Sequence, residues 1–175
     1  MNKTQTLETQ RLSLQPLVMT DAHLLFPLMS DPGVMAHWDI SEIDDPDLVA
    51  AIVAGQVRDM QTGRAVHWSL RRLSDGQFLG VCDLSDIDRW HHRAEIGFML
   101  DRDAWGQGYG FEAMSAVLTH AAAMNLRKLT ARTQLGNFRS DALLEKLGFH
   151  EEGLLRGHVL RDGERRDCRL FGLLM

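Results

Sequence analysis

A glycine-rich turn is the part of this 175-residue sequence best suited to bind an anion. The segment 105–113 reads Trp-Gly-Gln-Gly-Tyr-Gly-Phe-Glu-Ala and precedes an amphipathic stretch. Alternating glycines allow positive φ angles and let a ligand approach the backbone closely. The first N–H groups of a helix that begins here would lack intrahelical partners and, with the helix dipole, would favour phosphate oxygens. The open alternative is a tight strand-to-helix connection that binds nothing.

Two other phosphate-binding patterns do not fit this turn. A P-loop carries Lys and then Ser or Thr after its glycines, and no such pair follows here. The dinucleotide-binding fingerprint also fails, because its third glycine position is not filled and no first strand provides the context. The turn therefore predicts a phosphate site of another type.

Composition and charge restrict the possible partners. With 45% hydrophobic and 25% charged residues, the chain is an ordinary globular domain, and its net charge of −5 argues against nucleic acid as the main partner. No run approaches the about 18 apolar residues of a membrane helix, and no secretory signal is visible, so we expect no membrane partner. Cys82 and Cys168 match no metal-type spacing and indicate reduced thiols in a cytoplasmic protein.

Arginines near the end of the chain form a basic cluster, interleaved with acidic residues. This alternation favours a solvated hairpin over an anion site. The cluster consists of Arg156, Arg161, Arg165, Arg166 and Arg169.

The elements that position the turn can be expected from periodicity and turn residues. Alternation over 11–17 predicts a strand, and the segments 65–70 and 78–84 form a hairpin around Ser74-Asp75-Gly76. A strand over 93–100 leads into the turn, and after it the pattern is helix 111–124, strand 128–133, helix 140–147 and a strand after Gly148. The expected fold is α/β, one domain over residues 1–175 with a mixed sheet and helices on both faces.

Three helix starts are expected in the first half. Thr20 is predicted to cap a helix that includes 22–26. The pairs Asp31-Pro32 and Asp45-Pro46 each place an acidic residue before a proline, which suits a helix start. The helix after the second pair is expected to end near Gly63.

Three segments together resemble the GCN5-related N-acetyltransferases. Gly108 and Gly110 match the end of that family's Gln/Arg-x-x-Gly-x-Gly/Ala loop, with Trp105 in place of the leading residue. The segment 137–149 is similar to an Asn-x-x-Ser helix that ends in Lys-x-Gly-Phe, and 8–14 is similar to a first strand. Both are features of the branch that contains the ribosomal-protein N-terminal acetyltransferases. The resemblance covers nearly the whole chain.

The resemblance implies a sheet parted between its fourth and fifth strands, with the pantetheine arm of acetyl-CoA in the gap. The residues expected to bind this cofactor are Met99, Gln107, Gly108, Tyr109, Gly110, Phe111, Asn137 and Ser140. Those of the turn would donate amides to the pyrophosphate, and a backbone N–H between Ile96 and Met99 would meet the oxyanion. Asn137 would contact the pantetheine arm, although Asn is also a preferred helix cap.

Proton transfer needs a base for the amine and an acid for the leaving thiolate. Glu95 is the first candidate for the base, because alternation places it with Gly97 on one face of its strand; a solvent-facing glutamate is the alternative. In many relatives the position of Leu144 holds a tyrosine that protonates the leaving thiolate. Ser140 is therefore the candidate acid here, with helix capping as its alternative role. Val159 replaces a glutamate found in some relatives.

The acceptor is expected to be a primary amine. Trp38 and Glu95 are the candidate substrate residues, and the acidic stretch 39–47 could attract a cation or simply be a solvated loop. His67, His91 and His92 form no chelating pattern, so no metal is expected. The alternatives are a protein or peptide N-terminus, a small amine such as an amino sugar, polyamine or antibiotic, and an inactive acyl-CoA sensor. A homodimer is kept as an open possibility for the assembly.

Overall fold

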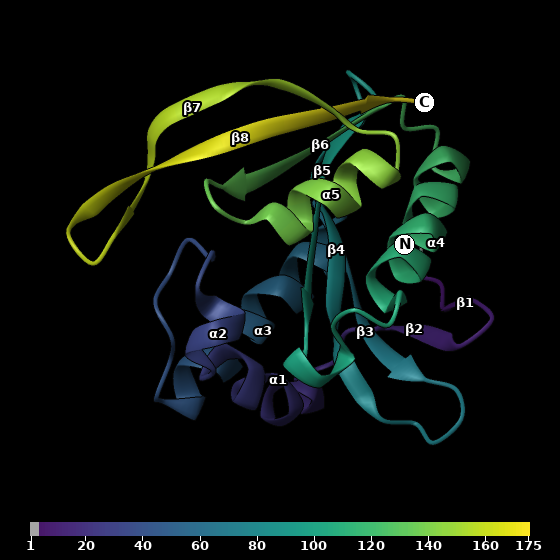
Figure 1. The fold of residues 1–175 in the computed structure, drawn as a ribbon. Coiled ribbons are helices and arrows are strands. Elements are labelled where there is room, and N and C mark those ends of the chain that lie inside the picture. The colour runs from purple at the N-terminus through teal and green to yellow at the C-terminus, as the bar shows by residue number, and fades with distance from the viewer. Residues whose placement is uncertain (1–3) are drawn as a thin grey trace.

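The computed structural model describes residues 4–175 and shows a mixed sheet with helices on both faces (Figure 1). Its eight strands follow the order β1-β2-β3-β4-β5-β6-β8-β7. The strands are β1 Leu7–Glu8, β2 Leu12–Pro16, β3 Val66–Arg72, β4 Phe78–Asp88, β5 Arg93–Leu100, β6 Lys128–Gln134, β7 His150–Arg161 and β8 Glu164–Leu174. The α-helices are α1 Ala22–Met29, α2 Pro32–Met35, α3 Pro46–Thr62, α4 Tyr109–Ala123 and α5 Phe138–Lys146. The α/β fold class expected from the sequence is confirmed.

The sheet parts between β5 and β6, which form its parallel pair (Figure 1). These strands pair at three positions, the last of which joins Glu95 to Thr130. Beyond it, β5 continues against β4 as far as Leu100, while β6 continues against β8 as far as Gln134. Apart from the two-residue strand β1, which the sequence did not predict, this is the expected gap between the fourth and fifth strands.

Side chains on the two faces of the sheet belong to two hydrophobic clusters. Trp68 and Leu129 point toward α4 and pack in a cluster with Met114 and Val117. Met99 points to the opposite face and packs in the cluster formed by α1, α2 and α3. Strand alternation produces this division, and it leaves polar residues of β3 to β6 on the face of α1 and α3.

The two expected acidic helix starts are confirmed. The Asp31 carboxylate accepts from Gly33 N at 2.7 Å, and that of Asp45 accepts from Asp47 N at 2.9 Å. Helix α3 ends at Gly63, whose φ of 73° is left-handed.

The expected cap at Thr20 is wrong. Thr20 lies inside a 3-10 turn, Met19–Asp21, that precedes α1. The Asp21 carboxylate instead accepts from Val18 N at 3.1 Å and pairs with Arg71 at 2.6 Å. A charged acceptor held by an arginine is stronger than a threonine hydroxyl, which explains the shifted start.

The hairpin of β7 and β8 carries the basic cluster, but one of its arginines is buried. Arg161 is 7% exposed and donates to Met35 O at 2.5 Å and to Trp38 O at 3.2 Å. The expectation of a solvated cluster is therefore wrong for this residue. The hairpin arches over the loop between α2 and α3 and fastens it (Figure 1).

No helix within residues 4–175 is both long enough and apolar enough to cross a membrane.

Candidate functional site

Unpaired backbone donors gather at the turn between β5 and α4. Gly106 and Gly108 adopt φ angles of 72° and 82°, and α4 begins at Tyr109. None of the hydrogen bonds found among residues 4–175 has its donor in the backbone from Gly106 to Phe111; the helix ladder starts with Glu112 N to Gly108 O at 3.1 Å. The turn therefore offers a run of unpaired N–H groups at a helix start, an arrangement that favours anions.

Contacts with the beginning of the chain hold this turn in place. The Glu112 carboxylate accepts from Thr9 Oγ1 at 2.6 Å and from Arg11 N and Nε, each at 2.7 Å. Burial alone would raise the pKa of Glu112, but these hydrogen bonds lower it. Arg11 Nη1 also donates to Gln107 O at 3.0 Å, so one arginine joins the turn to the first turn of α4.

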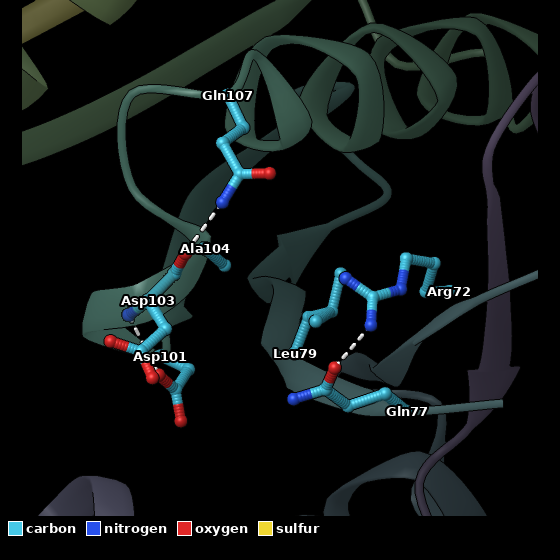
Figure 2. A pocket seen from close by; sticks show the side chains of 7 residues that line it. All are labelled: Arg72, Gln77, Leu79, Asp101, Asp103, Ala104 and Gln107. Atoms are coloured by element: carbon cyan, nitrogen blue, oxygen red, sulfur yellow. Dashed lines mark hydrogen bonds between the residues drawn. The ribbon is translucent and has the colours of Figure 1, made fainter. Parts of the chain in front are cut away.

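The Gln107 side chain points toward Asp103 and Ala104, as Figure 2 shows. Its Nε2 donates to Asp103 O at 2.5 Å. Below it lies a small cavity of about 30 Å³, enough for a water molecule, with Arg72 and Gln77 on its far wall. Gln107 can therefore offer its backbone N–H to a ligand, while its side chain braces the loop.

The glycines of the turn have different roles. A Cβ at Gly110 would lie 3.2 Å from Leu143 and 3.4 Å from Leu100, so this glycine lets α4 and α5 pack closely. At Gly108 the φ angle itself requires glycine. The Tyr109 ring is buried beneath the Arg11 guanidinium, 4.4 Å away, and leaves its backbone N–H at the helix start.

A shallow groove of about 520 Å³ runs beside the turn and contains basic side chains that the sequence analysis missed. Lys146 Nζ lies 4.4 Å from the centre of the Phe111 ring, and Arg11 lines the same groove. The groove is lined by Thr9, Gln10, Arg11, Gly108, Phe111, Glu112, Ser115, Ala116, Thr119 and Lys146. Phe111 and Lys146 lie in separate helices, α4 and α5, so no pattern within either segment of the sequence predicts their contact.

Backbone groups on one edge of β5 face the gap. Asp101 N donates to Leu79 O in β4 at 2.8 Å, whereas Leu100 O accepts from Trp105 Nε1 at 3.0 Å on the other side. The backbone N–H and C=O groups of successive strand residues point to alternate edges. Those of Ile96 and Phe98 therefore also face the gap, while those of Met99 face β4. The expected donor between 96 and 99 is therefore best supplied by Phe98, and Met99 contributes a buried side chain.

Helix α5 presents two polar side chains at its first turn. Asn137 Oδ1 accepts from Ser140 N at 3.3 Å, so Asn137 caps the helix and Ser140 does not. Among residues 4–175, neither Asn137 Nδ2 nor Ser140 Oγ has a hydrogen-bond partner. Buried Asp141 fixes this turn by accepting from Thr133 Oγ1 at 2.6 Å and Arg169 Nη1 at 2.5 Å.

An ion-paired glutamate lies where the strands part. Glu95 accepts from Arg132 Nε at 2.9 Å, across the gap, and Arg132 reaches Asp39 at 3.4 Å. Burial raises the pKa of Glu95 and Arg132 partly opposes this. Trp38 lies nearby, half-buried against the second cluster, and its carbonyl accepts from Gln134 Nε2 at 2.9 Å. The structure thus brings Trp38 and Glu95 to one side of the gap.

Asp83 is a further acidic residue on this face, and the sequence analysis did not consider it. It pairs in register with Gly97 of β5 and His67 of β3. Burial raises the pKa of Asp83 to about 6, with Ser85 opposing and Asp86 adding to the shift. Burial also lowers the pKa of His67 to about 4, so this histidine is neutral at pH 7. A charged residue inside the apolar run 78–84 was the available signal.

Comparison with known proteins agrees with this arrangement. A family model described as an acetyltransferase (GNAT) domain matches residues 11–150. The uncharacterized N-acetyltransferase p20 of Bacillus licheniformis is 31% identical over 172 residues, covering 97% of this chain and 96% of the relative.

Two solved structures share the fold. An acetyl transferase from Salmonella typhimurium, which modifies the N-terminal serine of ribosomal protein L7/L12, has a TM-score of 0.88 at 19% identity and covers 98% of this chain and 99% of its own. Spermidine N-acetyltransferase from Vibrio cholerae, in complex with CoA and spermine, has a TM-score of 0.82 at 20% identity and covers 93% of this chain and 95% of its own.

Proposed function

The chain belongs to the GNAT acetyltransferase family and is an acetyl-CoA-dependent N-acetyltransferase, and we propose that its acceptor is the α-amino group of a protein or peptide. The observation that carries this proposal is that arginines already bind the carboxylates near Trp38 and Glu95. Arg132 pairs with Asp39, and buried Arg161 pairs with Glu42 at 3.1 Å. Arg132 also pairs with Glu95 at 2.9 Å, and Arg161 also pairs with Asp162 at 3.3 Å. Carboxylates held in these pairs are less available to the several ammonium groups of a polyamine, whereas a peptide offers a single ammonium and carbonyl oxygens.

The acidic stretch 39–47 supports this choice because much of its charge is already used. Besides the two arginine pairs, Asp45 caps α3 and Ser41 is bound to Asp162 at 2.5 Å. The stretch is therefore a fastened loop between two parts of the fold. Attraction of a polycation would need carboxylates that are free of internal cations.

Acetyl-CoA is proposed to bind along the turn and the gap. The backbone N–H groups of 107–111 would bind the pyrophosphate, and Arg11 and Lys146 would add positive charge near its phosphates. Along the gap, Phe98 N–H would donate to the thioester oxygen, and Asn137 Nδ2 would donate to the pantetheine arm. Met99 would close the wall behind the thioester with its side chain.

The acceptor side would be formed by Trp38 and Glu95. Trp38, which packs against the second hydrophobic cluster, would wall the gap next to the fastened loop, where its ring would contact an incoming peptide. Glu95 was expected as the base, and this assignment stays a prediction. Because its ion pair with Arg132 keeps Glu95 charged and in place, this residue is as well suited to orient the acceptor ammonium as to act as the base. Cys82 and Cys168 are free, buried thiols, which fits the proposed cytoplasmic location.

Ser140→Ala is expected to lower kcat by about 10-fold while leaving the Kd for acetyl-CoA unchanged. The Ser140 hydroxyl would stabilise the leaving thiolate by a hydrogen bond that forms only during the reaction. Thiol-release kinetics and calorimetry measure the two quantities. Ser74→Ala, in the exposed β3–β4 turn, is the control. An equal loss of turnover and affinity would reduce Ser140 to a binding contact.

The acceptor class is tested by thiol release with acetyl-CoA and a panel of amines. The panel contains peptides that begin with Ser, Ala or Met, the same peptides with blocked N-termini, and spermidine. We expect kcat/KM for at least one free peptide to exceed that for spermidine by more than about 10-fold, and no reaction with blocked peptides. A preference for spermidine would contradict the proposed acceptor. Tight CoA binding with no turnover on any amine would identify an acyl-CoA sensor.

A further inference from the structure

Asp83 leans over a glycine toward the edge of β5 that borders the gap. Its Oδ1 lies 2.8 Å from the place where a Cβ would stand at Gly97. Any side chain at Gly97 would therefore push the Asp83 carboxylate away. Gly97 lies two residues beyond Glu95, the last residue of β5 that pairs with β6. Because Gly97 has no side chain, the Asp83 carboxylate of β4 can lie over β5, the strand that borders the gap.

Asp83 differs from its neighbour Glu95 in its ion pairing. None of the ion pairs found among residues 4–175 includes Asp83, whereas Glu95 is held by Arg132. The groups that face Asp83 are neutral His67 from β3, Ser85 and Asp86 from its own strand, and Glu95 from β5. The Arg132 charge is directed at Glu95 and Asp39. Within residues 4–175, Asp83 is therefore a carboxylate without an ion-pair partner, over the strand that borders the gap.

A second acceptor without a donor lies on the same side of the sheet. The buried Oε1 atom of Gln56, in α3, has no hydrogen-bond partner among the described residues. Helix α3 packs over this face, and its Asp59 lies close enough to His67 to affect the pKa of that histidine. Unmatched hydrogen-bond acceptors suit a ligand that only donates, and an ammonium group is such a ligand.

We infer that Asp83, in place of the expected Glu95, accepts the proton of the acceptor amine, directly or through one water molecule. The inference concerns the reaction of the family and holds for either acceptor class. In this step the ammonium gives one proton to the Asp83 carboxylate. The neutral nitrogen then attacks the thioester carbon, the C–N bond forms and the C–S bond breaks. The second N–H proton is lost as the amide forms, and the thiolate takes up one proton to leave as CoA–SH.

The acidity of Asp83 matches this task. An α-amino group has a pKa of about 8, so transfer to a carboxylate of pKa about 6 is unfavourable by about 100-fold. Transfer to an ordinary aspartate, with a pKa of about 4, would be unfavourable by about 10,000-fold. The burial that raises the pKa of Asp83 therefore makes it about 100-fold stronger as a base.

The proposal predicts a different pH dependence for two isosteric variants. Wild-type kcat/KM should fall as the pH drops through about 6, because Asp83 becomes protonated. Asp83→Asn should lower kcat by on the order of 100-fold and remove this acid limb, with an unchanged Kd for CoA. Glu95→Gln should keep the limb. The probe is the peptide or amine of the panel that wild-type turns over fastest, so an inactive wild-type would count against the family reaction and not against Asp83.

Gly97→Ala provides a second test without a change of charge. Its Cβ should displace the Asp83 carboxylate and lower kcat by about 10-fold or more, while CoA affinity is kept. Asp83→Asn should also raise the melting temperature at pH 8 but not at pH 4. The charged form is disfavoured by burial, so the wild-type protein loses stability as the pH rises through this range. Turnover of Asp83→Asn within threefold of wild-type, or a retained acid limb near pH 6, would overturn the inference.

Discussion

Replacing Gly108 by valine is expected to abolish detectable binding of coenzyme A while the protein stays folded. Gly108 is exposed and has a φ of 82°, a conformation that costs a residue with a side chain about 1–2 kcal/mol. A β-branched residue would move out of it and redirect the N–H groups that follow. Each hydrogen bond lost to a charged phosphate costs roughly 1.5–3 kcal/mol, so the Kd for CoA should rise by at least about 100-fold.

Gly163→Val is the matched control for this variant. Gly163 lies in the turn between β7 and β8 with a φ of 80°, and a Cβ there would meet no neighbour within 4 Å. It imposes the same backbone strain far from the expected pyrophosphate site. Calorimetry should therefore show unchanged CoA affinity for Gly163→Val. Unchanged affinity in Gly108→Val would mean that the turn is a connector and does not bind the cofactor.

Replacing Arg161 by methionine is expected to cost about 2–4 kcal/mol of unfolding free energy, because the buried carbonyl oxygens of Met35 and Trp38 lose a donor. For a chain of this size the melting temperature should fall by about 10 °C. The loop that contains Trp38 would be released from β7, so KM for the acceptor should rise. Thermal melts and steady-state kinetics measure both effects.

Arg156→Met is the matched control for the second variant. Arg156 lies in the same strand and is exposed, so its replacement should change the melting temperature by less than about 2 °C. The Kd for CoA should be unaffected in both variants, since neither residue lies near the turn. A loss of CoA affinity in Arg161→Met equal to the rise in acceptor KM would show a general disturbance of the fold and contradict the specific role.

Local signals were sufficient for most of the fold. The acidic residues before Pro32 and Pro46 predicted two helix starts, because the capping interaction is made within a few residues. Alternation and the turn at Gly76 predicted the β3–β4 hairpin. The predicted cap at Thr20 was wrong because Asp21 accepts the backbone N–H at this turn instead, and Asp21 is held by Arg71, which is distant in the chain. The prediction that Arg161 is solvated was wrong for the same reason, since its partners lie more than a hundred residues earlier in the chain.

The candidate site divides in the same way. The turn could be predicted because its glycines and its helix start are contiguous in the chain. Asp83 left a local signal, a charge inside the apolar run 78–84, but its raised pKa depends on burial and its position depends on Gly97, and neither is visible in its own strand. Gly110 shows the opposite case: a glycine that fits a ligand motif is also required by Leu143 of another helix.

The short pairing of β5 and β6 has a consequence for the lifetime of the enzyme. Three residue pairs are a small barrier to local opening, and this seam should exchange its amide hydrogens early. A metabolite that fills it binds the native state alone and so suppresses opening in proportion to its concentration. Proteolysis at this seam should therefore slow as the concentration of bound acetyl-CoA rises.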